Sequence, residues 1–130
     1  TTGAPAGRLE PVLEAEELLR LQALVREVAV AESLVRSVAR LVRSSRPGTP
    51  GADPASRPVA WGAGPRAGQA LLLAAKARAL LEGRFAASAE DVTALALPVL
   101  RHRLVLSWSA AGEGVDADAV VRQLLDASHL

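Results

Sequence analysis

Hydrophobic residues recur at intervals of three and four in the first third of the chain, and this spacing predicts two amphipathic helices. One set lies between Glu14 and Val28 and shares a helical face: Leu18, Leu21, Val25 and Val28. The next set has the same spacing: Ala31, Leu34, Val35, Val38, Leu41 and Val42. Charged residues take the opposite side of the second helix: Glu32, Arg36, Arg40 and Arg43. We expect the second helix to lie at the surface with one face buried.

The segment that follows, Ser44 to Pro58, contains four prolines and two glycines. Prolines lack an amide donor and fix one backbone angle, so they oppose regular structure. Long loops within compact domains are typically functional or disordered. Because this loop carries no cluster of ligand side chains, we interpret residues 44–58 as a flexible insertion.

A third helix has clear boundary signals. Gly64 suits the cap, Pro65 suits the first helical position, and Gly83 suits the residue past the end. A helical projection predicts a polar face and a close-packing face. The polar face holds Arg66, Gln69, Leu73, Lys76 and Leu80, and the packing face holds Ala70, Leu71, Ala74, Ala77 and Leu81.

A capping box of Ser88 and Asp91 predicts a fourth helix, which begins at Ser88 or just after it. Pro98 should kink or break this helix, with a second segment running through residues 99–106. A last helix should begin at Asp116, with Val115 packing on Val120. No strand-like alternation and no internal repeat is visible, so the sequence predicts an all-α fold, a small bundle of about four to five helices.

Composition narrows the function classes. The 130 residues suit one domain, and with only three aromatic residues the core must consist of Leu, Val and Ala. The net charge of +1 implies no long-range field for nucleic acid, and the absence of cysteine excludes disulfides and thiolate chemistry. No apolar run approaches the roughly 20 residues of a membrane helix, so we expect a soluble, cytoplasmic protein. The chain has no methionine, and we expect it to be a piece of a larger protein.

Three glycines around the start of the third helix differ by one residue in spacing from a dinucleotide-binding pattern: Gly62, Gly64 and Gly68. That pattern needs a preceding strand and an acidic ribose partner, and a phosphate loop needs a lysine after its last glycine. All of these are missing from the sequence pattern. The glycines alone therefore give little support to nucleotide binding.

Arg66 is the more informative residue, because a cation in the first turn of a helix is slightly unfavourable, by a few tenths of a kcal/mol. Two interpretations follow from the spacing: a solvated side chain, or a guanidinium that contacts a phosphate at the helix start. The residues themselves leave both open. A phosphate contact of useful strength requires dry walls that another part of the protein must supply.

Two further candidates carry alternative functions. His102 has no nucleophile or carboxylate at a readable spacing, which argues against general base catalysis. The basic face of Arg36, Arg40 and Arg43, with Arg46 just beyond, suits nucleic acid or a protein partner. No helix-turn-helix spacing accompanies it.

The chain resembles the C-terminal lid of the MoxR family of AAA+ ATPases in three stretches that occur in the family's order. They are WGAGPRAGQALLLAAKARALLEGR (61–84), SAEDVTALALPVLRHRL (88–104) and EGVDADAVVRQLL (113–125). The resemblance implies an AAA+ lid spanning residues 1–130, in which Arg66 of the G-x-x-P-R-A element is the sensor 2 arginine. That residue reaches the γ-phosphate of ATP bound by the core domain of the same subunit, and Gly64 would belong to the same nucleotide site.

The resemblance also implies partners: the AAA+ core domain, neighbouring subunits of a ring, commonly a hexamer, and proteins with a von Willebrand factor A domain. Members act as chaperones that mature or activate client complexes. The chain lacks the Walker A lysine loop, the Walker B carboxylates, the sensor 1 residue and the arginine finger. We therefore expect ATP hydrolysis from the parent protein and not from this chain alone, with Mg²⁺ held by the core and no metal site here.

Overall fold

The computed structural model describes residues 10–128 and 130, and within them helices dominate. Six α-helices are present in these residues: α1 (Ala15–Glu27), α2 (Glu32–Ser44), α3 (Pro65–Leu81), α4 (Ala89–Leu100), α5 (Trp108–Gly112) and α6 (Ala117–Ser128). Short 3₁₀ helices, η1 (Pro54–Ser56) and η2 (Arg101–Arg103), follow α2 and α4. The all-α class is confirmed, and the short α5 raises the helix number above the four to five expected.

The sequence has no strand-like alternation of useful length, and the strands in the described residues are four very short segments. β1 (Ala29–Val30) pairs in parallel with β3 (Ala86–Ala87), and β2 (Val59–Trp61) pairs antiparallel with β4 (Val105–Leu106). Segments of two or three residues are too short to show an alternating pattern. Their pairing depends on contacts between distant parts of the chain, which a local pattern does not contain.

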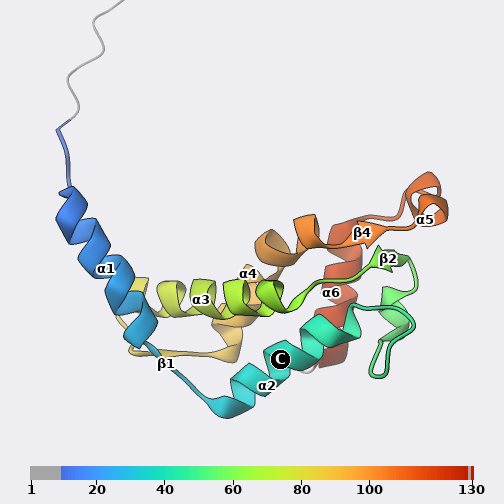
Figure 1. Cartoon of the computed structure of the whole chain (residues 1–130), viewed down its shortest axis with the longest axis horizontal. Helices are drawn as coiled ribbons and strands as arrows, with labels where there is room; N and C mark the ends of the chain where they lie inside the picture. Colours follow the sequence, from blue (N-terminus) through green and yellow to red (C-terminus); the bar gives the residue numbers. More distant parts are fainter. Residues whose placement is uncertain (1–9, 129) are drawn as a thin grey trace, which may run out of the picture.

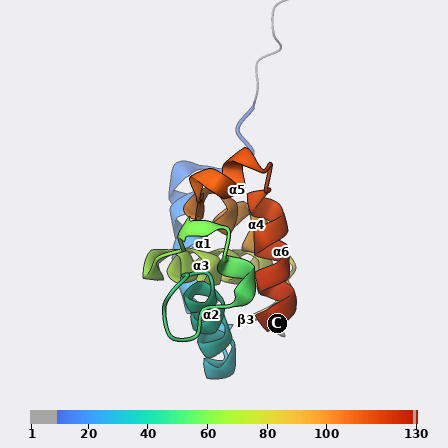
Figure 2. The same ribbon diagram turned by 90° about the vertical axis from the view of Figure 1, so that its right-hand side faces the viewer.

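Helix α3 runs through the middle of the molecule, with α1 at one of its ends, α2 along one side and α4 along another (Figure 1). Turned by a quarter, the molecule shows α6 standing beside α2 and α4 (Figure 2). The buried residues of α3 are Ala67, Gly68, Leu71, Ala75 and Ala79. Of the predicted packing face only Leu71 is fully buried; Ala70, Ala74 and Ala77 are half-buried, and the prediction was wrong at Leu81, which is 88% exposed. Because α3 is rich in alanine and packed on several sides, its sequence has no clear polar stripe that would indicate which face is buried.

The predicted helix boundaries are confirmed where the sequence has capping signals. Gly64 caps α3 ahead of Pro65, and Gly83 after α3 has the positive φ of 73° that favours glycine. Ser88 and Asp91 form the predicted capping box at the start of α4. At α6 the Oδ1 of Asp116 accepts a hydrogen bond of 3.1 Å from the amide of Asp118.

The segment after Pro98 differs from the expectation. Helix α4 continues through Pro98 to Leu100, and the predicted second segment is replaced by η2 and then β4. The proline removes one hydrogen bond of the ladder, and it lies so close to the helix end that few further bonds depend on it. Pairing of β4 with β2 then holds the chain extended.

Residues 45–58 are attached to the bundle at both ends. Ser45 is buried, and its hydroxyl accepts a hydrogen bond of 3.0 Å from the amide of Ala63. The Nε of Arg46 donates to the carbonyl of Ala63 at 2.8 Å. At the other end of the segment, the carbonyl of Pro58 accepts a hydrogen bond of 2.8 Å from the amide of Ser107. The sequence suggested no regular structure here, yet η1 forms at Pro54, capped by the side chain of Asp53.

Helix α1 forms as predicted, but none of its residues is buried. Its face leaves several leucines 41–65% exposed: Leu18, Leu19, Leu21 and Leu24. Only Val28, just past the helix, enters the core. No helix in the described ranges combines the length and apolar character needed to cross a bilayer.

Candidate functional site

Arg66 lies in the first turn of α3 with its side chain exposed. It makes no hydrogen bond or ion pair with any residue that the structure describes. The cap residue Gly64 has an extended backbone, with φ −86° and ψ 173°, and it has no side chain that could accept from the helix amides. The positive end of the helix dipole and the guanidinium of Arg66 therefore form one region of positive potential.

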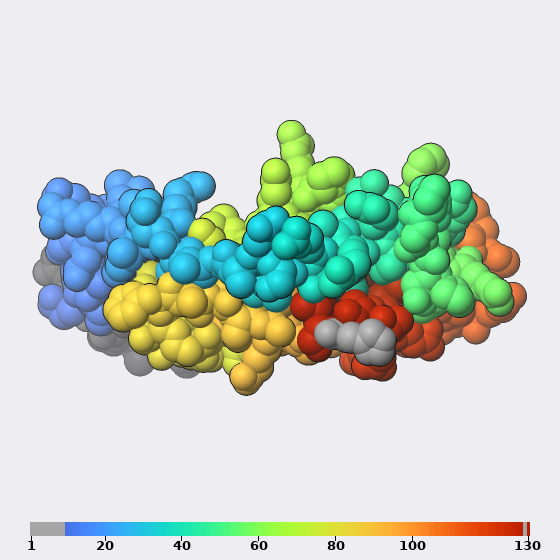
Figure 3. Space-filling model, turned by 90° about the horizontal axis from the view of Figure 1, so that it is seen from below, coloured from blue at the N-terminus to red at the C-terminus, as the bar shows by residue number. Residues whose placement is uncertain are grey.

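A hollow of about 530 Å³ lies beside this helix start. Its lining residues come from three elements: Arg26 of α1, Arg66, Gln69, Ala70 and Leu73 of α3, and Arg103 of η2. Seen from below, the start of α3 (lime green) projects from the surface, and a notch separates it from α1 (blue) (Figure 3). The hollow thus has three cationic side chains and no acidic one.

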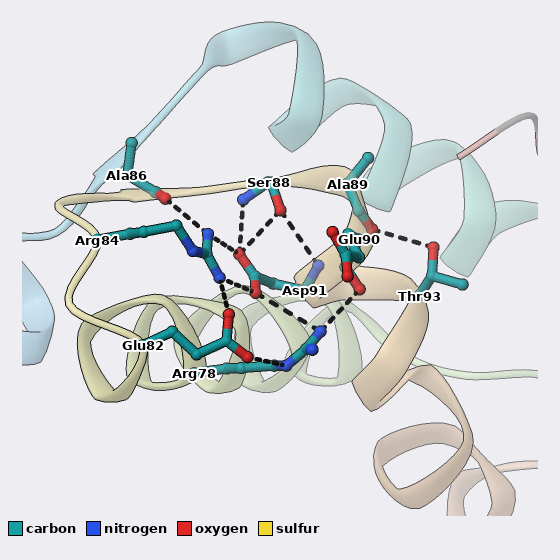
Figure 4. A network of polar contacts seen from close by, with 9 residues as sticks. All are labelled: Arg78, Glu82, Arg84, Ala86, Ser88, Ala89, Glu90, Asp91 and Thr93. Atoms are coloured by element: carbon teal, nitrogen blue, oxygen red, sulfur yellow. Dashed lines mark hydrogen bonds and ion pairs between the residues drawn. The ribbon is translucent and has the colours of Figure 1, made fainter.

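The opposite end of α3 is fixed to α4 by a buried carboxylate (Figure 4). Arg84 donates from Nη2 to Oδ1 of Asp91 at 2.6 Å and from Nη1 to Oδ2 at 2.8 Å. The amide of Ser88 donates to the same Oδ2 at 2.8 Å. This network joins the segment that leaves α3 to the first turn of α4, and so fixes the two helices relative to each other.

The hydrogen bonds from Arg84 hold the pKa of Asp91 well below its usual range, and they outweigh burial, which acts in the opposite direction. The same bonds, with those to Glu82, raise the pKa of Arg84 further above its ordinary value. Asp91 is therefore ionised at neutral pH although its side chain is fully buried. Its role is structural, since its carboxylate accepts from the amide of Ser88 at the start of α4 and pairs with two arginines, Arg84 and Arg78.

The three glycines have different surroundings. A Cβ on Gly62 would lie 2.4 Å from the carbonyl oxygen of Ser45, so only glycine permits this approach of the backbones. A Cβ on Gly68 would lie in ordinary contact with Val42 and Val38 of α2, whereas one on Gly64 would meet nothing within 4 Å. The glycine pattern at Gly62 is thus explained by packing and not by a nucleotide.

The basic face of α2 is divided among several contacts. Arg36 pairs with Glu32 at 2.9 Å, and Arg40 donates to the hydroxyl of Ser37 at 2.9 Å. Arg46 is turned toward Ala63, which removes it from this face. His102 is exposed in η2 and makes no hydrogen bond or ion pair with a nucleophile or carboxylate in the described part of the chain.

Sequence reasoning missed Arg26 and Arg103 as members of the site. The pattern around residues 101–103 drew attention to His102, whereas the fold brings the next residue to the hollow. No spacing signal connects residues 26, 66 and 103, because only the packing of α1 and η2 around α3 brings them together. Among the described residues no group of three or more His, Cys, Asp or Glu residues could hold a metal ion.

Comparison with known proteins gives a family match and several relatives. The family model described as AAA lid domain matches residues 51–124. Chaperone MoxR1 of Mycobacterium tuberculosis is 34% identical over 124 residues, covering 95% of this chain and 33% of that protein. Protein MoxR of Paracoccus denitrificans is 42% identical over 78 residues, covering 60% of this chain and 22% of that protein.

A crystal structure of a candidate ATPase from Cytophaga hutchinsonii has a similar fold, with a TM-score of 0.79 and 28% sequence identity. The similarity covers 85% of this chain and 34% of that one. The chain therefore spans about a third of the length of its fuller matches.

Proposed function

Because the chain belongs to the AAA lid domain family and is similar to MoxR proteins, we propose that it closes over ATP bound by a separate AAA+ core domain. The family match confirms the resemblance to the MoxR lid. In this proposal Arg66 is the sensor 2 arginine and contacts the γ-phosphate, while Gly64 leaves room for the nucleotide beside the helix start. ATP and Mg²⁺ are held by the core domain.

One observation carries the assignment of Arg66: its guanidinium is exposed, unpaired within the described residues, and presented by the helix that other helices enclose. A helix fixed on several sides can hold a charge at a defined place. A cation so held stabilises charge that develops on the transferred phosphoryl group. Because the contact forms only when the lid meets the nucleotide, it couples hydrolysis to a movement of the whole lid.

We place this lid in a ring of subunits, commonly a hexamer, that matures or activates client proteins in the cytoplasm. Chaperone MoxR1 carries the word chaperone in its name, which supports this part of the proposal. A protein with a von Willebrand factor A domain is the partner that we would test first. Each of these statements concerns the whole protein and goes beyond the lid.

The test is ATP turnover in the protein that combines this lid with its core. Arg66→Ala should lower kcat by at least tenfold while circular dichroism and the unfolding midpoint stay unchanged. Arg36→Ala is the matched control, because Arg36 is also an exposed helical arginine and its only described partner is Glu32. Turnover near the wild-type rate in Arg66→Ala would refute the sensor role.

The alternative function, a protein or nucleic-acid interaction through the face of Arg36, Arg40 and Arg43, stays a prediction. It has weaker support, because Arg36 and Arg40 already have partners on their own helix. Retardation of DNA or RNA that disappears as salt rises would support it. No retardation at low salt would exclude the nucleic-acid form of this alternative.

A further inference from the structure

Most arginine side chains in the described residues have a hydrogen-bond or ion-pair partner, as in the pairs of Arg20 with Glu16, Arg101 with Asp118 and Arg84 with Asp91. Five of the described arginines have no such partner: Arg26, Arg43, Arg57, Arg66 and Arg103. Three of these five line the same hollow: Arg26, Arg66 and Arg103. Like charges gathered without a counter-charge repel one another, so this arrangement favours an anion between them.

Arg103 adds a more specific observation. Its Nε is buried, and it is the only buried side-chain nitrogen or oxygen in the described part of the chain without a hydrogen-bond partner. A buried donor that lacks an acceptor is costly, and native proteins nearly always satisfy it. Nε has no exposed surface in this conformation, so an oxygen of an anion bound in the hollow would satisfy this donor after the guanidinium turns toward the hollow.

The fold holds Arg103 in place relative to Arg66. Arg103 belongs to η2, which directly follows α4, and α4 is joined to the far end of α3 by Asp91. The residue after it, Leu104, is buried in the core. The two arginines thus approach the hollow from two elements whose relative position is set by the bundle.

We propose that Arg103, assisted by Arg26, is a second phosphate-binding residue, which holds the same polyphosphate chain that Arg66 contacts. The identity of the ligand as the phosphates of ATP rests on the proposed function, whereas binding of a polyphosphate in the hollow does not. Arg103 donates through Nε, and Gln69 supplies a neutral donor from the next turn of α3. A planar fork suits phosphate oxygens better than an ammonium does.

Binding is tested on the 130-residue chain with inorganic tripolyphosphate as the probe. The Nε–H resonances of arginine, recorded by ¹H–¹⁵N NMR, should shift for Arg103 with saturation. Arg103→Gln should weaken binding at least tenfold, and Arg103→Lys, which keeps the charge but lacks the Nε donor, should restore it only in part. Arg101→Gln is the matched control in the same 3₁₀ helix, because Arg101 pairs with Asp118 away from the hollow, and it should bind like the wild type.

A second measurement separates this inference from the proposed function. In the longer protein, loss of ATP turnover in both Arg66→Ala and Arg103→Gln supports both proposals. Loss in Arg66→Ala alone, with tripolyphosphate binding unchanged by Arg103→Gln, overturns the role of Arg103 and leaves the sensor role intact. Weakened tripolyphosphate binding in Arg103→Gln, with normal turnover in both variants, supports the anion site and overturns the sensor role.

Discussion

Arg84 donates to the carboxylate of Asp91 from both of its terminal nitrogens, at 2.6 and 2.8 Å. Arg84 lies just after α3, whereas Asp91 lies in the first turn of α4. The carboxylate is fully buried, and it also caps α4 through Ser88. The side chain of Asp91 thus holds Arg84, which follows α3, and also caps the start of α4.

Asp91→Ala should destabilise the chain by about 3 kcal/mol, because it removes the cap of α4 and leaves the guanidinium of Arg84 without its buried partner. Chemical denaturation at pH 7 measures this change. Glu82→Ala is the control, because Glu82 also pairs with Arg84 and Arg78 but its side chain is 46% exposed. The expected loss of stability in this variant is below about 1 kcal/mol. Equal losses in the two variants would contradict the role given to Asp91.

The depressed pKa of Asp91 predicts a defined dependence of stability on pH. In the unfolded chain the pKa of an aspartate is about 3.9, and in the folded chain the pKa of Asp91 lies well below that value. Its contribution is therefore complete above the unfolded pKa and is lost as the pH falls toward the folded pKa. We expect the difference in unfolding free energy between wild type and Asp91→Asn to stay constant from pH 7 to 5 and to narrow below pH 4. A constant difference down to the most acidic measurable pH would disprove this.

The glycines before α3 offer a matched pair of substitutions. Gly62→Ala would place a Cβ 2.4 Å from the carbonyl oxygen of Ser45, and the backbones must separate, at a cost of about 3 kcal/mol. Gly64→Ala meets nothing within 4 Å, and at a helix cap it should cost less than about 1 kcal/mol. Thermal unfolding of the two variants would distinguish these effects. Similar midpoints would show that the close approach at Gly62 is not required.

The flexible-loop hypothesis for residues 44–58 can now be narrowed to its centre. Residues 48–51 are exposed, and Gly48 and Gly51 have φ of 71° and 87°, whereas Ser45 and Ser56 are buried. Amides of this centre should exchange hydrogen for deuterium at least 100-fold faster than those in the middle of α3. Mass spectrometry of peptides from both regions measures this ratio. Protection equal to that of α3 would contradict a flexible insertion.

Much of the fold was predictable because it depends on local chemistry. The capping box of Ser88 and Asp91, the Gly64–Pro65 start and the glycine after α3 are sequence-local signals, and each marks a helix boundary in the structure. The amphipathic pattern of α2 likewise included its buried residues Leu34, Val38, Leu41 and Val42, although two further positions of the predicted face, Ala31 and Val35, are exposed. These elements carry their instructions within a few neighbouring residues.

The rest depends on distant parts of the chain. The buried face of α3 was misread because alanine and glycine give no contrast, and the small strands arise only when their partners meet. For the same reason Arg66 was singled out from its local position, whereas Arg26 and Arg103 emerged only with the packing. Asp91 was recognised as a cap, but its bond to Arg84 required the folded connection.

The length of α3 has a consequence for any residue at its start. Its 17 residues span about 25 Å, from the network at Asp91 to Arg66. A tilt of roughly 10° about the distal end would displace the guanidinium by about 4 Å, which exceeds the range over which a hydrogen bond to phosphate can persist. The angle at which α3 is fixed near Asp91 therefore determines whether the guanidinium of Arg66 can contact a phosphate. If Arg66 has the proposed sensor role, loss of the ion pair of Asp91 should lower ATP turnover in a protein that combines this lid with a core domain, even when Arg66 itself is intact.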